Sequence, residues 1–132
     1  MQIQLPYGKK KVSIEVPKKN IYYMADRCET SGVRNPETAI KAGLKNPIGT
    51  PPLSRLAKSK DRVLIIVDDL TRPTPQKVIL PVLLNELNNA GIRDQNIEVL
   101  IGLGTHRPMS EKEIVERFGN SLVERIPIIN HD

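Results

Sequence analysis

Three short apolar runs, separated by loops and helical patterns, constrain the fold more than any other feature of this chain. They span residues 62–67, 97–101 and 126–129. A continuous apolar run of this length is typical of a strand buried on both faces. The order strand, loop, helix, strand, loop, helix, strand predicts an α/β fold. We expect a parallel, Rossmann-like sheet with right-handed crossovers and helices on both faces.

Helical spacing fills the two connections between these runs. Between the first two runs, apolar residues recur every three or four positions, at Ile79, Leu80, Leu83, Leu84 and Leu87. This helix is expected to reach Ala90, with Gly91 as its left-handed cap. Pro81 is expected to kink the helix or to mark its true start. Ser110 and Glu113 form a capping box, which predicts a second helix ending near Phe118.

The residues before the first run predict further elements of the same domain. Alternating apolar residues over 2–5 and 11–16 predict an N-terminal β-hairpin, and residues 21–24 predict a third short strand. Asn35, followed by a proline, predicts an N-cap and a helix to about Leu44. The length of 132 residues suits one domain, so residues 1–132 are predicted to form a single one.

Composition limits the class of protein. The apolar fraction of 39% and the charged fraction of 27% predict a folded domain rather than a disordered, collagen-like or coiled-coil chain. No apolar run reaches the roughly 18–20 residues of a membrane span. The N-terminus shows no export signal, so no membrane partner is expected. The single cysteine, Cys28, excludes an internal disulfide, fits a reducing cytoplasm and is interpreted as a plain buried thiol.

The net charge of +5, from 20 Lys and Arg against 15 Asp and Glu, raises the alternative of a nucleic-acid-binding domain. The lysines, however, are concentrated at positions 9–11 and 18–19, where solvated lysines would protect a sheet edge. The chain has 3 Tyr, 1 Phe and no Trp, which is too few for a base-stacking surface. We therefore expect no nucleic-acid partner.

The loop over residues 68–75 follows the first predicted strand and carries two acids and an arginine. Parallel sheets bind ligands at the carboxyl ends of their strands, which is where this loop lies. The guanidinium of Arg72 suits a carboxylate or a phosphate. Asp69 could orient a neighbouring base or accept a hydrogen bond from a substrate hydroxyl. In the alternative, Arg72 pairs with one of the aspartates and the prolines only stiffen the loop.

The loop over residues 102–109 follows the second predicted strand and holds two glycines, a histidine and an arginine. Glycine allows positive φ or a close approach to a ligand. Histidine exchanges protons near neutral pH, so His106 is a candidate general base. In the alternative, His106 bonds to the loop backbone, and Arg107 is solvated or held by the next helix. The role of His131, the other histidine, stays open between function and a turn.

Several other site classes are excluded because their motifs are missing. The chain has no histidine–carboxylate cluster with metal-ligand spacing, so no metal ligand is assigned. The Gly-x-Ser-x-Gly nucleophile elbow is missing. The Gly-x-Gly of the second loop lacks both the third glycine of a dinucleotide site and the ending of a P-loop.

Four segments together resemble the N-terminal domain of the nickel-dependent lactate racemases, which use a nickel-pincer nucleotide. The segments are Asn46-Pro-Ile-Gly-Thr-Pro-Pro-Leu-Ser54, Asp61-Arg-Val-Leu-Ile-Ile-Val67, Asp69-Leu-Thr-Arg-Pro-Thr-Pro75 and Gly104-Thr-His-Arg-Pro-Met-Ser110. The last two, on successive strand ends, form a specific signature. The resemblance covers in effect the whole chain, and it implies an isomerase that acts on a small 2-hydroxy acid.

The resemblance also implies roles for the matched residues. In the family, the cofactor takes a hydride from C2 of the substrate while a histidine removes the hydroxyl proton, and His106 matches that histidine. Arg72 matches the arginine that holds the substrate carboxylate. Asp69 matches the acid beside that arginine and is grouped with it as substrate-binding. The further candidates for the cofactor cleft are Thr71, Gly104, Thr105 and Arg107.

The family's enzyme is longer than this chain and has a C-terminal domain, with the cofactor in the cleft between the two domains. The resemblance implies that the second catalytic histidine, the nickel ligand and the lysine that tethers the cofactor lie in that second domain. Residues 1–132 are therefore expected to need that domain as a partner and to be inactive alone. The alternative from another class is a non-enzymatic anion- or nucleotide-binding module that uses Arg72, Arg107 and the glycine-rich loop.

Overall fold

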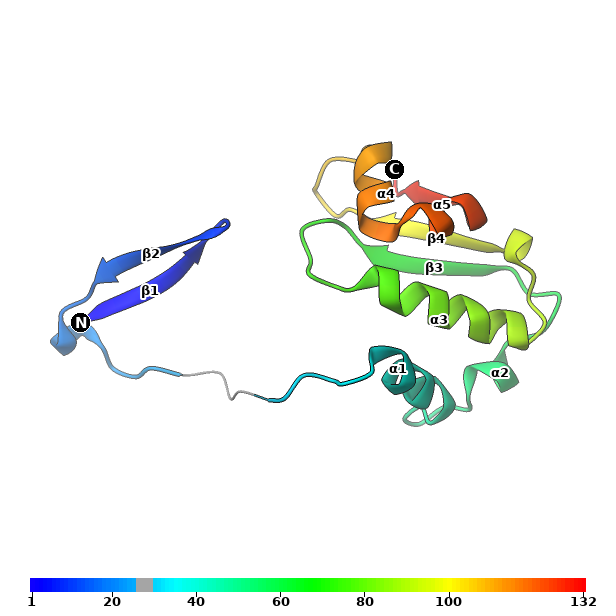
Figure 1. Cartoon of the computed structure of the whole chain (residues 1–132), viewed down its shortest axis with the longest axis horizontal. Coiled ribbons are helices and arrows are strands. Elements are labelled where there is room, and N and C mark those ends of the chain that lie inside the picture. Colours follow the sequence, from blue (N-terminus) through cyan, green and yellow to red (C-terminus); the bar gives the residue numbers. More distant parts are fainter. Residues whose placement is uncertain (26–29) are drawn as a thin grey trace. The chain divides into compact units, whose positions relative to one another are not determined.

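The computed structural model describes residues 1–25 and 30–132 (Figure 1). They group into two compact units, Met1–Gly32 and Val33–Asp132, which are described separately. The interpretation of Cys28 as a buried thiol falls on a residue outside the described ones. In the described residues, no helix is both long and apolar enough to cross a membrane.

The first unit is built on the predicted β-hairpin. Strand β1 (Gln2–Tyr7) pairs antiparallel with β2 (Lys10–Glu15), and Gly8 in the turn between them has a φ of 59°. Both strands reach closer to the turn than expected. A short 3₁₀ helix, η1 (Lys18–Asn20), follows. The third strand predicted at 21–24 is wrong: these residues pair with no strand among those that the structure describes, and Tyr22 and Tyr23 are exposed.

Two helices open the second unit. The side chain of Asn35 accepts a hydrogen bond of 3.0 Å from the backbone N–H of Thr38, which caps α1 (Pro36–Lys45) as predicted. Residues 46–52 are irregular, as their prolines require, and the single turn α2 (Leu53–Leu56) follows. Both helices contact α3 (Gln76–Asn89), the first helix of the sheet crossovers.

The predicted parallel sheet is confirmed. Its strands are β3 (Val63–Asp68), β4 (Ile97–Gly102) and β5 (Ile128–Asn130), and they lie side by side in that order. Asp68 and Gly102, the last residues of β3 and β4, are partners in the register. The loops that leave these two strands therefore start next to each other, at the same edge of the sheet.

The crossovers follow the predicted helical patterns, with one addition. Helix α3 begins at Gln76 and runs through Pro81, so the alternative that Pro81 marks its start is wrong. The helix ends before Gly91, whose φ is 92°. The 3₁₀ turn η2 (Asp94–Asn96) then leads into β4. The capping box of Ser110 and Glu113 opens α4 (Glu111–Phe118). A further helix that the sequence did not predict, α5 (Asn120–Arg125), begins after Gly119, whose φ of 89° breaks the helical path.

The prediction of helices on both faces of the sheet is wrong for the described residues. Side chains of α3, α4 and α5 share a single core with alternate residues of β3 and β4. On the other face, Leu64 and Ile66 of β3 are 51% and 71% exposed, and Ile129 of β5 is 47% exposed. The strands lie in the sheet in the same order as in the chain, so both crossovers run in the same direction across it. Because crossovers of this kind are right-handed, both connecting segments then lie on the same face of the sheet. The apolar runs are therefore buried on one face only.

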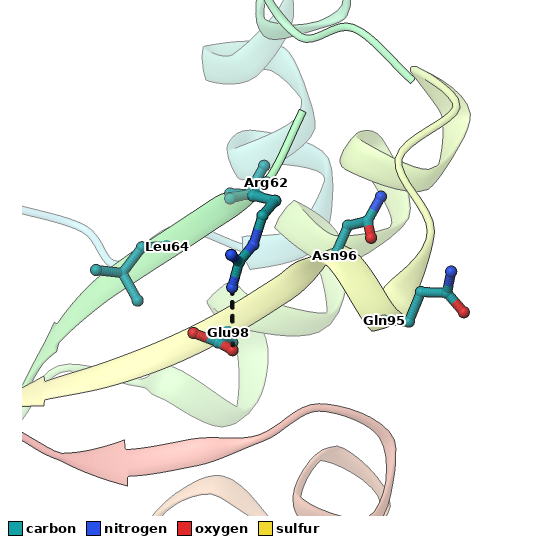
Figure 2. Close-up of a pocket in the computed structure, with 6 residues that line it drawn as sticks. Arg62, Leu64, Gln95, Asn96 and Glu98 are labelled. Carbon is teal, nitrogen blue, oxygen red and sulfur yellow. Dashed lines mark ion pairs between the residues drawn. The ribbon is translucent and has the colours of Figure 1, made fainter. Parts of the chain in front are cut away.

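A hollow on this open face lies at the amino ends of β3 and β4 (Figure 2). Arg62 and Glu98 face each other across it, with 3.9 Å between guanidinium nitrogen and carboxylate oxygen, and both side chains are substantially exposed. The predicted site loops leave the opposite ends of the same strands. The hollow is therefore separate from the candidate site.

Candidate functional site

The loops after β3 and β4 meet through a contact between an aspartate and a histidine. Nδ1 of His106 lies 2.5 Å from Oδ2 of Asp69, although the two residues are 37 positions apart in the chain. Both were predicted as site residues, and the adjacent strand ends bring them together. A carboxylate bonded to one ring nitrogen of a histidine orients the ring and selects the tautomer that carries its proton on that nitrogen.

Asp69 is fully engaged by protein groups. Its Oδ1 accepts hydrogen bonds from the backbone N–H of Thr71 at 3.1 Å and from the Thr71 hydroxyl at 2.7 Å. The residue is only 5% exposed. The Thr71 hydroxyl, and to a lesser extent His106, hold the pKa of Asp69 below its ordinary value despite burial. Of the two roles expected for Asp69, this geometry favours orienting a base over bonding a substrate hydroxyl.

His106 presents its other nitrogen away from Asp69. The side chain is 49% exposed, and within the described parts of the chain no hydrogen bond to Nε2 is recorded. Its backbone N–H donates to the carbonyl of Leu103 at 3.0 Å, which closes a tight turn. Gly104, inside that turn, has a φ of 59°, a value that glycine adopts without strain. With Nδ1 protonated toward Asp69, the lone pair of Nε2 can accept a proton.

Arg72 lies at the middle of the first loop with an exposed side chain. Its backbone is tied at both ends, because its N–H donates to the carbonyl of Asp69 at 3.4 Å and its carbonyl accepts from Arg117 at 3.0 Å. Its pairing with an aspartate, the alternative left open above, is not formed: Asp69 pairs with His106 and Asp68 pairs with Arg117. The guanidinium is thus available to an anion.

Arg107 is paired with a carboxylate of the helix that follows its loop. Its two terminal nitrogens donate to the carboxylate of Glu113 at 2.9 and 2.7 Å. Arg107, together with the backbone N–H of Ser110, lowers the pKa of Glu113 to about 2. Helix α4 therefore holds Arg107, as one of the alternatives expected. Of the other cleft candidates, Thr71 supports Asp69, while Gly104 and Thr105 are exposed in the loop.

Two pairs that support the loops were missed in the sequence. Arg117 of α4 bonds the carboxylate of Asp68 and the carbonyl of Arg72. Asn130 of β5 accepts from the N–H of Met109 and donates to its carbonyl, both at 2.9 Å, which fixes the end of the second loop. A usable signal for Arg117 is its position three residues after buried Ile114, next to the inward face of α4.

Within residues 1–25 and 30–132, no group of three or more His, Cys, Asp or Glu side chains could hold a metal ion. The two-residue contact of Asp69 and His106 is too small for a metal centre, and its carboxylate oxygens already have donors. The residues described here therefore do not fit a bound nickel centre by themselves.

Within residues 1–25 and 30–132, the two loops at the carboxyl edge of the parallel sheet thus carry a histidine oriented by a carboxylate and an arginine with no carboxylate partner, and α/β domains bind their ligands at this edge. Comparison with known proteins identifies the family. Residues 7–132 match the family described as the lactate racemase N-terminal domain. This chain belongs to that family.

Two curated relatives are named lactate racemase. The one from Thermoanaerobacterium thermosaccharolyticum is 36% identical over 132 residues, and the one from Lactiplantibacillus plantarum is 30% identical over 131. Each alignment covers 98% of this chain but only 31% of the relative. The chain thus spans less than a third of the length of these relatives.

Two solved structures are similar to this chain in fold. The structure of the lactate racemase apoprotein from Thermoanaerobacterium thermosaccharolyticum is similar with a TM-score of 0.74 at 34% identity, and it covers 100% of this chain and 30% of that one. A crystal structure of a protein from Thermotoga maritima is similar with a TM-score of 0.51 at 27% identity, over 73% of this chain and 21% of that one.

Proposed function

We propose that the full-length protein interconverts the two enantiomers of lactate or of a similar small 2-hydroxy acid, and that this domain supplies one general base and the carboxylate site. The observation that carries this proposal is the contact between Asp69 and His106, which frees Nε2 to accept a proton. The names of the relatives support the choice of substrate.

In the proposed reaction, Nε2 of His106 removes the proton from the substrate hydroxyl. The negative charge of Asp69 stabilises the imidazolium that results and keeps the ring in place. Arg72 binds the substrate carboxylate through a charge-assisted hydrogen bond. Because the carboxylate and the hydroxyl-bearing carbon are directly bonded, holding the first places the second within reach of a fixed base.

The remaining parts of the active site are proposed to come from residues outside this chain. The nickel-pincer nucleotide implied by the resemblance would be held there, in a C-terminal domain that faces the carboxyl edge of the sheet, and it would supply the acceptor that takes the hydride from C2 of the substrate and returns it. No step proposed for His106, Asp69 or Arg72 passes through the metal. The cytoplasmic location inferred above stays a prediction.

The full-length protein tests this function directly. Cofactor-loaded protein incubated with pure L-lactate is expected to give a racemic mixture by chiral chromatography. Residues 1–132 alone are expected to leave L-lactate unchanged, since half of the site is missing. If the loaded full-length protein leaves lactate unchanged and still binds inorganic phosphate in calorimetry, the non-enzymatic anion-binding module becomes the better account.

Replacing Arg72 by alanine in the full-length protein is expected to raise KM for lactate about 10- to 100-fold. The reason is the loss of a charged hydrogen bond, worth about 1.5–3 kcal/mol. Steady-state kinetics of Arg72→Ala and Arg72→Lys measure the effect, and the lysine variant should keep part of the affinity. Arg93→Ala is the matched control, because Arg93 is exposed at the opposite end of the strands. Equal KM values in Arg72→Ala and the wild type would contradict the role of Arg72.

A further inference from the structure

Arg117 contacts the first site loop at two separate points. Its Nη2 bonds Oδ1 of Asp68, the last residue of β3, where the loop begins. Its Nη1 donates to the carbonyl of Arg72, in the middle of the loop, at 3.0 Å. The side chain is 12% exposed. In the described part of the chain Nε has no hydrogen-bond partner, so the two terminal nitrogens set the orientation of the guanidinium.

Asp68 joins this contact to the start of the next helix. It also accepts hydrogen bonds from the Thr74 hydroxyl and, at 2.9 Å, from the side chain of Gln76, the first residue of α3. Burial raises the pKa of Asp68, but the hydrogen bonds from Thr74, Gln76 and Arg117 together outweigh burial. The pKa of Asp68 is therefore below its ordinary value. The carboxylate therefore stays ionised, and Arg117 closes a network that spans the loop from its first residue to its last.

Arg117 also connects the two loops of the site. It lies in α4, the helix that follows the His106 loop, and its contacts are on the loop that carries Arg72. The loops are thus linked twice, by His106 with Asp69 and by Arg117 with Asp68 and Arg72. A 2-hydroxy acid carries its carboxylate and hydroxyl on neighbouring carbons, so an enzyme for it needs a fixed spacing between the guanidinium and the imidazole.

We propose that Arg117 is a positioning residue, which sets the place of Arg72 relative to His106 and so determines the affinity for the substrate carboxylate. This inference rests on the proposed function of Arg72. A planar fork with two fixed donors suits the task, because it can reach the carboxylate and the carbonyl at once. Lysine keeps the charge but places it at one point, so it cannot hold both groups in the same geometry.

Kinetics of the full-length protein test the proposal. Arg117→Lys is expected to raise KM for lactate about tenfold, with kcat changed less than KM, because the misplaced group binds rather than reacts. In an Arg72→Ala background, Arg117→Lys should add almost nothing to KM, since the residue through which it acts is gone. A purely structural role predicts instead that the two effects multiply.

The matched control is Arg125→Lys. Arg125, in α5, bonds Asp94 in the turn before β4 at 2.6 Å and also bonds Asn88. Like Arg117, it is a partly buried arginine paired with an aspartate, but it lies away from the site loops. Its lysine variant is expected to lower the melting temperature and to leave KM unchanged. An unchanged KM in Arg117→Lys, or a multiplied effect in the double variant, overturns the proposal.

Hydrogen exchange provides a measurement that does not depend on catalysis. Mass spectrometry of the full-length protein should show faster exchange over residues 69–74 in Arg117→Lys than in the wild type or in Arg125→Lys. If the wild type fails to turn over lactate, the proposed function is wrong, and the exchange experiment still decides whether Arg117 holds the loop. Unchanged exchange over these residues overturns the positioning role.

Discussion

Replacement of His106 by alanine in the full-length protein is expected to lower kcat for lactate about 10²- to 10⁴-fold, the usual contribution of a general base. The fold should be unaffected, because the ring is half exposed and its loop is held by backbone bonds and by Asn130. Chiral analysis of initial rates from each enantiomer measures the loss. Since the equilibrium constant between enantiomers is one, kcat/KM must fall by the same factor in both directions.

The chain contains its own control for this experiment. His131 is the other histidine, and it is exposed and bonds to the carbonyl of Ile101 through its backbone N–H, which alanine retains. His131→Ala is therefore expected to keep wild-type rates. A His106→Ala variant that works within about twofold of the wild type, with the same melting temperature, removes the general base from the proposal.

Replacement of Asp69 by asparagine is expected to lower kcat by up to about 10⁴-fold without unfolding the domain. The amide oxygen must face Thr71, whose backbone N–H can only donate. The amide NH₂ then points at Nδ1 of His106 and donates to it, so the ring proton moves to Nε2. In that tautomer Nε2 has no lone pair for the substrate proton, and the base is lost although every heavy atom keeps its place.

A second substitution separates this tautomer effect from simple loss of support. Thr71→Val removes one of the two hydrogen bonds to Oδ1 but leaves the contact of Asp69 with His106 intact, so a reduction of less than about tenfold is expected. Steady-state kinetics and thermal unfolding of both variants make the comparison. Equal losses in the two variants would show that Asp69 acts only by supporting the loop.

The pH dependence follows from the low pKa of Asp69. The pKa of the Asp69 carboxyl is lower in the folded protein than in the unfolded chain. Such a group stabilises the fold at pH values above its unfolded pKa, and this stabilisation is lost as the pH falls through its folded pKa. Asp69 therefore stays ionised throughout the neutral range. A loss of activity between pH 5 and 8 in the wild type would report a group other than Asp69.

The elements with local signals could be predicted from the sequence. The N-cap of Asn35, the capping box of Ser110 and Glu113, and the left-handed Gly91 all lie where their sequence patterns place them. The hairpin and the parallel strands also follow from spacing within a few residues. The short strand expected at 21–24 was wrong, because a strand needs a partner and no local pattern supplies one.

The two site loops were predicted, but the contacts that organise them were not. Motifs on successive strand ends indicated Asp69, Arg72 and His106 as candidate site residues, and their roles stay predictions. The pairing of Asp68 with Arg117, 49 residues away, and of Met109 with Asn130, 21 residues away, depends on how α4 and β5 pack. The availability of Arg72 also depends on this packing, since Arg117 and His106 occupy the two aspartates that could have paired with it.

The sequence by itself determined the strands, the capped helices and the chemical groups carried by the two loops, because each depends on neighbours within one or two turns of chain. For the residues that the structure describes, the tertiary structure alone decided that helices cover one face of the sheet, that Asp69 contacts His106, and that Glu113 holds Arg107 while no carboxylate pairs with Arg72. These features depend on the order of the strands in the sheet and on which side chains, far apart in the chain, come into contact. Neither the strand order nor these contacts can be predicted from short stretches of sequence.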